Sequence, residues 1–145
     1  MKTNFLASAR VAPAALLVVG LTLLSGCATP FRAPPDVAHI KLTRTDDSST
    51  VIVEKIWLER KKGPLVVKGY VVKQLSATDT TGTHLDVTLF DATGKVIRST
   101  VEQFEPRQIP RRYRMPDYAS YSIPLDPLPA NTARIDVRAH EGNHS

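Results

Sequence analysis

The sequence lacks several features that would assign it to a familiar class. Its only cysteine is Cys27, so the chain cannot form an internal disulfide. Its longest apolar run, residues 11–24, contains Pro13 and is shorter than the roughly 20 residues that a membrane-spanning helix needs. The hydrolase patterns Gly-x-Ser-x-Gly, Ser-x-x-Lys and His-Glu-x-x-His do not occur. These absences argue against a disulfide framework, an uncleaved membrane span and a recognisable hydrolase.

The N-terminal 26 residues have the order of an export signal. Lys2 and Arg10 precede the apolar residues 11–24, and the small residues Ser25 and Gly26 follow them. A basic start, an apolar middle and a small-residue cleavage zone are typical of a secretory signal peptide. We therefore predict that residues 1–26 are removed on export.

The end of this segment, Leu24-Ser25-Gly26-Cys27, resembles the lipobox of bacterial lipoproteins. The resemblance implies cleavage before Cys27 and lipidation of its thiol and amine by fatty acids such as palmitate. Two or three chains suffice for stable attachment to membrane lipid, since each buried CH₂ contributes about 0.8 kcal/mol. Ala28, where lipoproteins retained in the inner membrane carry aspartate, implies the periplasmic face of the outer membrane. An ordinary signal peptide and an uncleaved anchor are the alternatives.

The remaining chain, about 119 residues, has the size of one domain. Residues 27–36 comprise the lipidated cysteine and a proline-rich tether, and residues 37–145 form the predicted domain. Loss of Lys2 and Arg10 reduces the net charge from +5 to +3. This mild positive charge gives no reason to expect nucleic acid as a partner.

From residue 37 onward, apolar residues recur with a period of two, which predicts strands. We predict about seven short strands, near residues 40–43, 50–60, 65–75, 84–89, 95–104, 121–125 and 132–140. With turn residues between them and no helical crossovers, this pattern favours an all-β fold, an antiparallel sandwich of immunoglobulin-like type. A closed barrel of similar size is the alternative.

Two of these segments carry more detailed expectations. In residues 50–60, strict alternation places Ile52, Ile56 and Leu58 on one face and Val51, Val53 and Trp57 on the other, with Trp57 as a core anchor. Residues 65–75 are almost continuously apolar, which predicts burial on both faces or a central position, and Gly69 suggests a bulge.

The order of the later segments adds a resemblance. Leu85-Asp-Val-Thr-Leu-Phe-Asp-Ala-Thr-Gly-Lys-Val, Tyr121-Ser-Ile-Pro-Leu and Ala133-Arg-Ile-Asp-Val-Arg are similar to segments of small immunoglobulin-like domains in bacterial envelope proteins. The resemblance implies architecture alone, because unrelated functions use such sandwiches and no catalytic motif is carried over.

A proline-punctuated segment, residues 106–118, interleaves arginine with tyrosine; we call it the crossing. Arginine and tyrosine are enriched at binding hot spots, which predicts a partner-binding surface. The candidates are Arg107, Arg111, Arg112, Tyr113, Arg114, Tyr118 and Tyr121. The alternatives are that the tyrosines cover the open end of the sandwich while the arginines face solvent, or that the arginines bind lipid phosphates.

A second constellation offers a metal site. His84 and Asp86 lie two apart in a predicted strand and so share a face, where a histidine from another strand, His140, could complete a zinc or copper site. Surface histidines are the simpler interpretation, and we expect no cofactor. The sequence thus predicts a non-catalytic, lipid-anchored periplasmic module that binds another envelope component. A metal-binding lipoprotein and a small envelope hydrolase are the alternatives.

Overall fold

The structure, a computed structural model, describes residues 33–60, 62–111 and 117–142. It contains a short 3₁₀ helix and seven strands: η1 (Pro35–Val37), β1 (Lys41–Asp46), β2 (Val51–Glu59), β3 (Val66–Lys73), β4 (Thr83–Phe90), β5 (Val96–Glu102), β6 (Tyr118–Pro124) and β7 (Arg134–Glu141). The predicted export signal, Cys27 and three crossing residues, Arg112, Tyr113 and Arg114, lie outside the described residues. Within the described part of the chain, no helix is long and apolar enough to span a bilayer.

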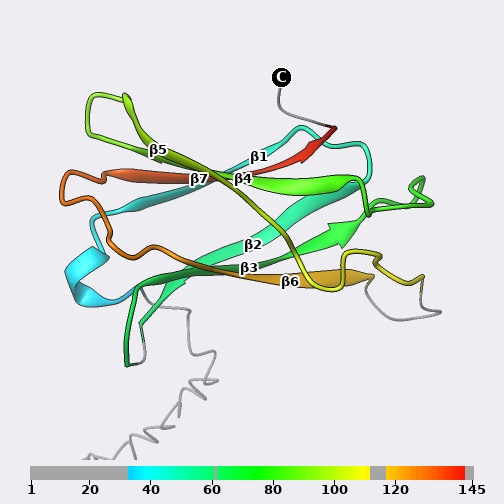
Figure 1. Cartoon of the computed structure of the whole chain (residues 1–145), viewed down its shortest axis with the longest axis horizontal. Coiled ribbons are helices and arrows are strands. Elements are labelled where there is room, and N and C mark those ends of the chain that lie inside the picture. Colours follow the sequence, from blue (N-terminus) through cyan, green and yellow to red (C-terminus); the bar gives the residue numbers. More distant parts are fainter. Residues whose placement is uncertain (1–32, 61, 112–116, 143–145) are drawn as a thin grey trace, which may run out of the picture.

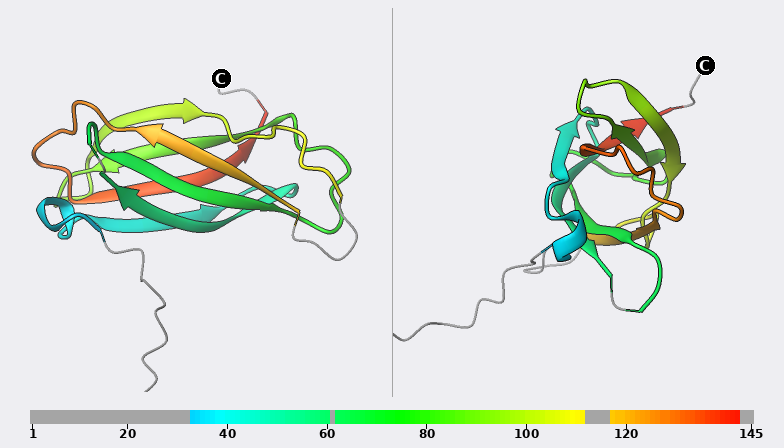
Figure 2. Two further views of the ribbon diagram at one scale, coloured as in Figure 1. Left: turned by 90° about the horizontal axis from the view of Figure 1, so that it is seen from below. Right: turned by 90° about the vertical axis from the view of Figure 1, so that its left-hand side faces the viewer.

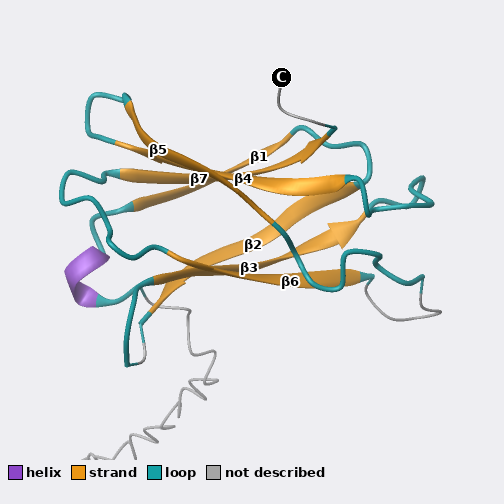
Figure 3. Cartoon of the chain, viewed as in Figure 1, coloured by secondary structure: helices purple, strands orange, loops and turns teal. Residues whose placement is uncertain are grey.

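The strands form two sheets packed face to face (Figure 1, Figure 3). One has four strands in the order β1-β7-β4-β5, and the other has three in the order β2-β3-β6. The predicted all-β sandwich of seven strands is confirmed. The expectation of wholly antiparallel pairing is wrong at one place, because β1 lies parallel to β7. The turn after β1 leads into the other sheet, so β1 pairs with the last strand instead of forming a hairpin with β2.

Strict alternation in β2 fails at a bulge. The pairing of β2 with β3 shifts register between Val53 and Lys55, so one additional residue enters the strand there. Val51, Val53 and Leu58 consequently all face the core. The prediction that Trp57 is a core anchor is wrong, because the bulge turns its side chain to the outer face of the sheet, where it contacts the Tyr70 ring.

β3 is the central strand of its sheet, as predicted, but only one of its faces is in the core. Val67 and Val71 are buried between the sheets, whereas Val66, Tyr70 and Val72 face outward and are partly exposed. Gly69 does not itself form the bulge. It lies opposite Ile56 on β2 and Tyr121 on β6, next to the bulged residues.

The two ends of the sandwich differ (Figure 1, Figure 2). We call one the tether end: it holds the first described residues, η1 and the turn at residues 91–95. We call the other the crossing end: it holds the turn at 47–50, the loop at 74–82, the described part of the crossing and the end of β7. Of the sequence-predicted partner residues that the structure describes, Arg107, Arg111 and Tyr118 lie toward the crossing end, as does the candidate metal residue His84.

Candidate functional site

Hydrogen bonds fasten the crossing to the loop at residues 74–82. The buried hydroxyl of Thr80 donates to the Arg107 carbonyl oxygen at 2.6 Å and accepts from the Ile109 amide at 3.0 Å. The Gln108 side chain accepts from the Thr80 amide at 3.1 Å and donates to the Thr78 carbonyl at 3.2 Å. Phe104 and Ile109 are buried in the core. The crossing therefore has a defined shape up to residue 111.

The two described arginines of the crossing lie on the surface of this assembly. Arg107 donates to the carbonyl of Thr81, and Arg111 donates to that of Leu75 at 3.2 Å. Lys73 joins the same two segments by donating to the carbonyls of Thr78 at 3.0 Å and Ile109 at 3.2 Å. The side chain of Leu75 is 89% exposed beside these cations. We define the crossing surface by Leu75, Arg107 and Arg111.

The two described tyrosines have different environments. Tyr118, at the start of β6, is 53% exposed and contacts the Tyr70 ring with centroids 5.9 Å apart. Tyr121 is only 4% exposed and faces the core, and burial raises the pKa of its hydroxyl. Tyr121 is therefore inaccessible to a partner and is not part of the crossing surface. It lies in the core, opposite Gly69 in mid-strand, and so it does not cover the open end of the sandwich either.

The residue just before the crossing pairs with β6. Glu105 and Ser120 exchange two backbone hydrogen bonds, at 2.8 Å and 2.9 Å, to form an isolated antiparallel bridge. This bridge occupies part of the free edge of β6, the strand on the outside of the three-stranded sheet. It also fixes where the crossing leaves the sandwich.

A polar cavity of about 630 Å³ opens at the crossing end. Among its lining residues are His84, Arg107 and Glu141. The Glu141 carboxylate accepts from the Ser48 hydroxyl at 2.7 Å and from the amides of Ser49 at 2.6 Å and Thr50 at 3.0 Å. These hydrogen bonds, that of the Ser48 hydroxyl first among them, lower the pKa of Glu141. Glu141 thus holds the 48–50 turn against the end of β7.

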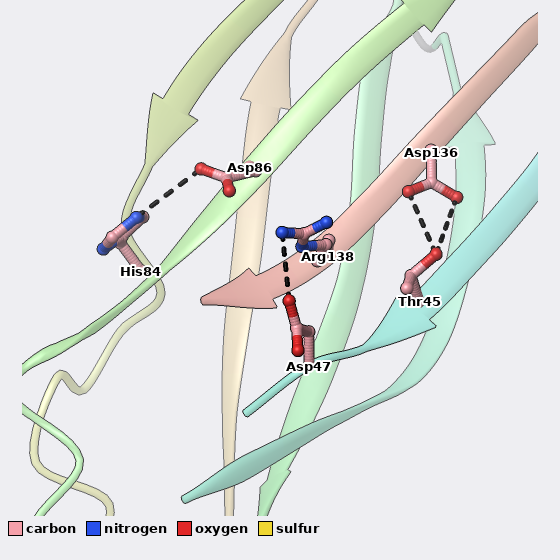
Figure 4. A network of polar contacts seen from close by, with 6 residues as sticks. All are labelled: Thr45, Asp47, His84, Asp86, Asp136 and Arg138. Carbon is pink, nitrogen blue, oxygen red and sulfur yellow. Dashed lines mark hydrogen bonds and ion pairs between the residues drawn. The ribbon is translucent and has the colours of Figure 1, made fainter. Parts of the chain in front are cut away.

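The outer face of the four-stranded sheet carries a polar network (Figure 4). His84 lies opposite His140 in the β4–β7 register, with ring centroids 5.4 Å apart, and its Nε2 is 3.5 Å from Asp86 Oδ1. Beside them Arg138 pairs with Asp47 at 3.0 Å, and Asp136 accepts from the hydroxyl of Thr45 (Figure 4).

The structure thus brings together the three residues of the metal hypothesis, from β4 and β7. Nevertheless, within residues 33–60, 62–111 and 117–142, no group of three or more histidine, cysteine, aspartate or glutamate side chains is arranged to hold a metal ion. The contact between His84 and Asp86 is the one that an ion pair with a structural role would also make, so it does not by itself indicate a metal. This cluster carries no functional proposal.

Comparison with protein-family models, with curated proteins and with solved structures finds no match for this chain. The site therefore has to be interpreted from its own residues. Sequence reasoning found the arginines of the crossing but missed Leu75, Thr80 and Lys73, which shape the surface. The signal in the sequence that could have indicated Leu75 is its place as an apolar residue next to the polar residues 76–83.

Proposed function

We propose that this protein is a non-catalytic lipoprotein of the bacterial cell envelope that is anchored through acyl chains on Cys27. In this proposal it acts as a binding or accessory module, and its crossing surface contacts another envelope protein. The anchor follows from the lipobox resemblance of residues 24–27 and from the apolar leader before it. The immunoglobulin-like character of the domain belongs to the same proposal.

The observation that supports a binding role is the construction of the crossing surface. An almost fully exposed leucine lies beside Arg111. Its loop is tied to the crossing by hydrogen bonds of the buried Thr80 and of the Gln108 side chain. A preorganised surface loses less conformational entropy on binding than a flexible loop does. Arginine is enriched at protein-binding hot spots, and Arg111 lies directly beside this leucine.

The hydrogen bonds of the crossing surface favour a protein partner over lipid phosphates. This surface lies at the end of the sandwich opposite the tether end (Figure 2). The two arginines also donate to carbonyl groups of the neighbouring loop, which leaves fewer donors for phosphate.

Two measurements test this proposal. Intact-mass analysis of the membrane-extracted protein should show loss of residues 1–26 and addition of acyl chains at Cys27. A photo-crosslinking residue at position 75 of the full chain, in its native envelope, should give a discrete protein adduct that Arg111→Ala weakens several-fold. Lys62, an exposed position at the tether end, is the matched crosslinking control, and Arg60→Ala is the matched charge control.

Adducts of equal yield from positions 62 and 75, or an adduct from position 75 that Arg111→Ala leaves unchanged, would contradict the role of the crossing surface. A full-length mass without acyl chains would contradict the anchor.

A further inference from the structure

The outer face of the three-stranded sheet is unusually apolar for a surface. The pairing registers place four rows of three side chains on it, one from each strand: Ile52, Val72 and Tyr118; Lys55, Tyr70 and Ser120; Trp57, Lys68 and Ser122; Glu59, Val66 and Pro124. Strand spacing and the rise per residue give this face a size of roughly 15 by 25 Å. Seven of its twelve residues are aromatic or aliphatic, and apolar side chains gathered on one face in this way often mark an interaction site.

The opposite outer face has a different composition. On β4 and β7 the residues of the four-stranded sheet's outer face are His84, Asp86, Thr88, Phe90, Arg134, Asp136, Arg138 and His140. The four-stranded side of the sandwich is therefore richer in charge and the three-stranded side richer in aromatic rings. The outward residues Val66, Tyr70 and Val72 also explain why the sequence of β3 is almost continuously apolar.

Aromatic rings run diagonally across the three-stranded sheet. Trp57 meets Tyr70 edge to face at 6.1 Å, and Tyr70 meets Tyr118 at 5.9 Å. Beside them is a mainly apolar groove of about 580 Å³. The Lys55 ammonium lies 5.6 Å from the centre of the Tyr70 ring, and Lys68 pairs with Glu59 at 3.2 Å. Rings with lysine ammoniums among them are the side chains favoured where hydrocarbon meets lipid headgroups.

The first described residues reach the sandwich beside this same face. Residues 33–35 line a surface cavity together with Trp57 and Arg60, and Asp36 pairs with Arg60 at 2.9 Å. Only five residues separate Cys27 from Ala33, and the six residue-to-residue steps between them span at most about 20 Å when fully extended. An acylated Cys27 would therefore hold the Trp57 corner of this face close to the bilayer.

We propose that the outer face of the three-stranded sheet rests on the membrane surface, with Trp57, Tyr70 and Tyr118 at the level of the lipid headgroups. This inference depends on the proposed anchoring at Cys27 and adds to it an orientation. The sandwich lies on its aromatic side, and the polar network around Arg138 faces away from the membrane. Lys55 and Lys68 meet the phosphates, with a preference for anionic lipid.

Trp57 is the only tryptophan in the chain, so its fluorescence reports on this face without labelling. The protein extracted from the membrane after expression of the full chain is reconstituted into vesicles of phosphatidylethanolamine and phosphatidylglycerol with bromine on the acyl chains. Its fluorescence is compared with that in unbrominated vesicles. We expect a blue-shifted emission and bromine quenching of Trp57. The matched control is the double variant Trp57→Phe, Phe90→Trp, whose reporter lies on the charged outer face.

Quenching should be at least about twofold greater for Trp57 than for the Phe90→Trp reporter, because only the former lies at the interface. Replacing phosphatidylglycerol by phosphatidylcholine should reduce the quenching of Trp57. Equal quenching at the two positions, or water-like emission from both, would overturn the orientation. Intact mass of the same sample separates the two proposals: an acylated protein with unquenched Trp57 contradicts the orientation alone, whereas an unacylated protein contradicts both.

Discussion

The hydroxyl of Tyr121 donates a 2.9 Å hydrogen bond to the backbone carbonyl of Lys55, two strands away. The contact passes over Gly69 on the strand between them, where a Cβ would lie 2.0 Å from the Lys55 oxygen and 2.2 Å from the Tyr121 hydroxyl. Lys55 follows the β2 bulge, where the sheet ladder shifts. The tyrosine, the glycine and the bulge therefore form one structural unit.

Replacement of Tyr121 by phenylalanine tests this unit. The ring would remain, but the Lys55 carbonyl at the bulge would lose its donor, so we expect a loss of about 1–3 kcal/mol in the free energy of unfolding. Denaturant titration measures it. Tyr118→Phe, at the exposed tyrosine, should change stability by less than about 0.5 kcal/mol. Equal effects in both variants would show that the bond contributes nothing specific.

A side chain at Gly69 should be poorly tolerated. In Gly69→Ala the new methyl group would clash with both a backbone oxygen and the Tyr121 ring, so we expect destabilisation of about 3 kcal/mol, the upper range for overpacking. Gly82→Ala is the matched control, because a Cβ there meets no atom within 4 Å. Thermal unfolding of the two variants compares them, and a Gly69→Ala protein as stable as Gly82→Ala would contradict the close approach.

Thr80 should determine the order of the crossing. Thr80→Val keeps the shape of the buried side chain but removes both hydrogen bonds of its hydroxyl, at an expected cost of about 1–3 kcal/mol. Hydrogen exchange of the amides of the non-proline residues in 105–111 should accelerate, while exchange in β4 and β7 should stay close to that of the parent protein. If Leu75 and Arg111 bind a partner, crosslinking from position 75 should fall as well. Unaltered exchange in the crossing would refute this role of Thr80.

Glu141 should make the free energy of unfolding depend on pH in the acid range. Its pKa in the folded protein lies below the ordinary value of 4.5, because Ser48, Ser49 and Thr50 donate to its carboxylate. The stabilisation is therefore fully present above that ordinary value and is lost as the pH falls through the lower folded value. The glutamate is exposed, so the effect is small. Unfolding between pH 7 and pH 2 should show Glu141→Gln less stable than the parent near neutrality, with the difference vanishing in acid.

The strands were predictable because each has a clear two-residue period between turn residues. The Asp91 turn, for example, follows from an aspartate that accepts from Thr93 and Lys95, and those bonds lower its pKa. The faces of β2 were not predictable, since nothing in Val53, Glu54 and Lys55 identifies which residue is the additional one. That single insertion reversed the assignment of Trp57. The parallel pairing of β1 was equally hidden, because it depends on a partner about 90 residues later in the sequence.

Prediction of the candidate site was limited for a different reason. Exposed arginines in a proline-rich segment are visible as residue types, so Arg107 and Arg111 could be named. Their surroundings depend on Thr80, from another loop, and on Lys73, from the end of β3, and neither residue has a distinctive sequence pattern. The cross-strand placement of His84 and His140 required the register of two strands far apart in the chain. Sequence periodicity determines which residues share a face but not which strands become neighbours.

The bridge between Glu105 and Ser120 has a consequence for crowding. In the proposed anchored state, copies on one membrane surface would meet at high local concentration, and an open strand edge allows unwanted pairing of one sheet with the next. Two of the edge groups of β6 are already taken by the chain's own Glu105, and Pro124 lacks an amide hydrogen at the far end of the same strand. The segment that shapes the crossing surface thereby also protects the molecule against self-assembly along β6.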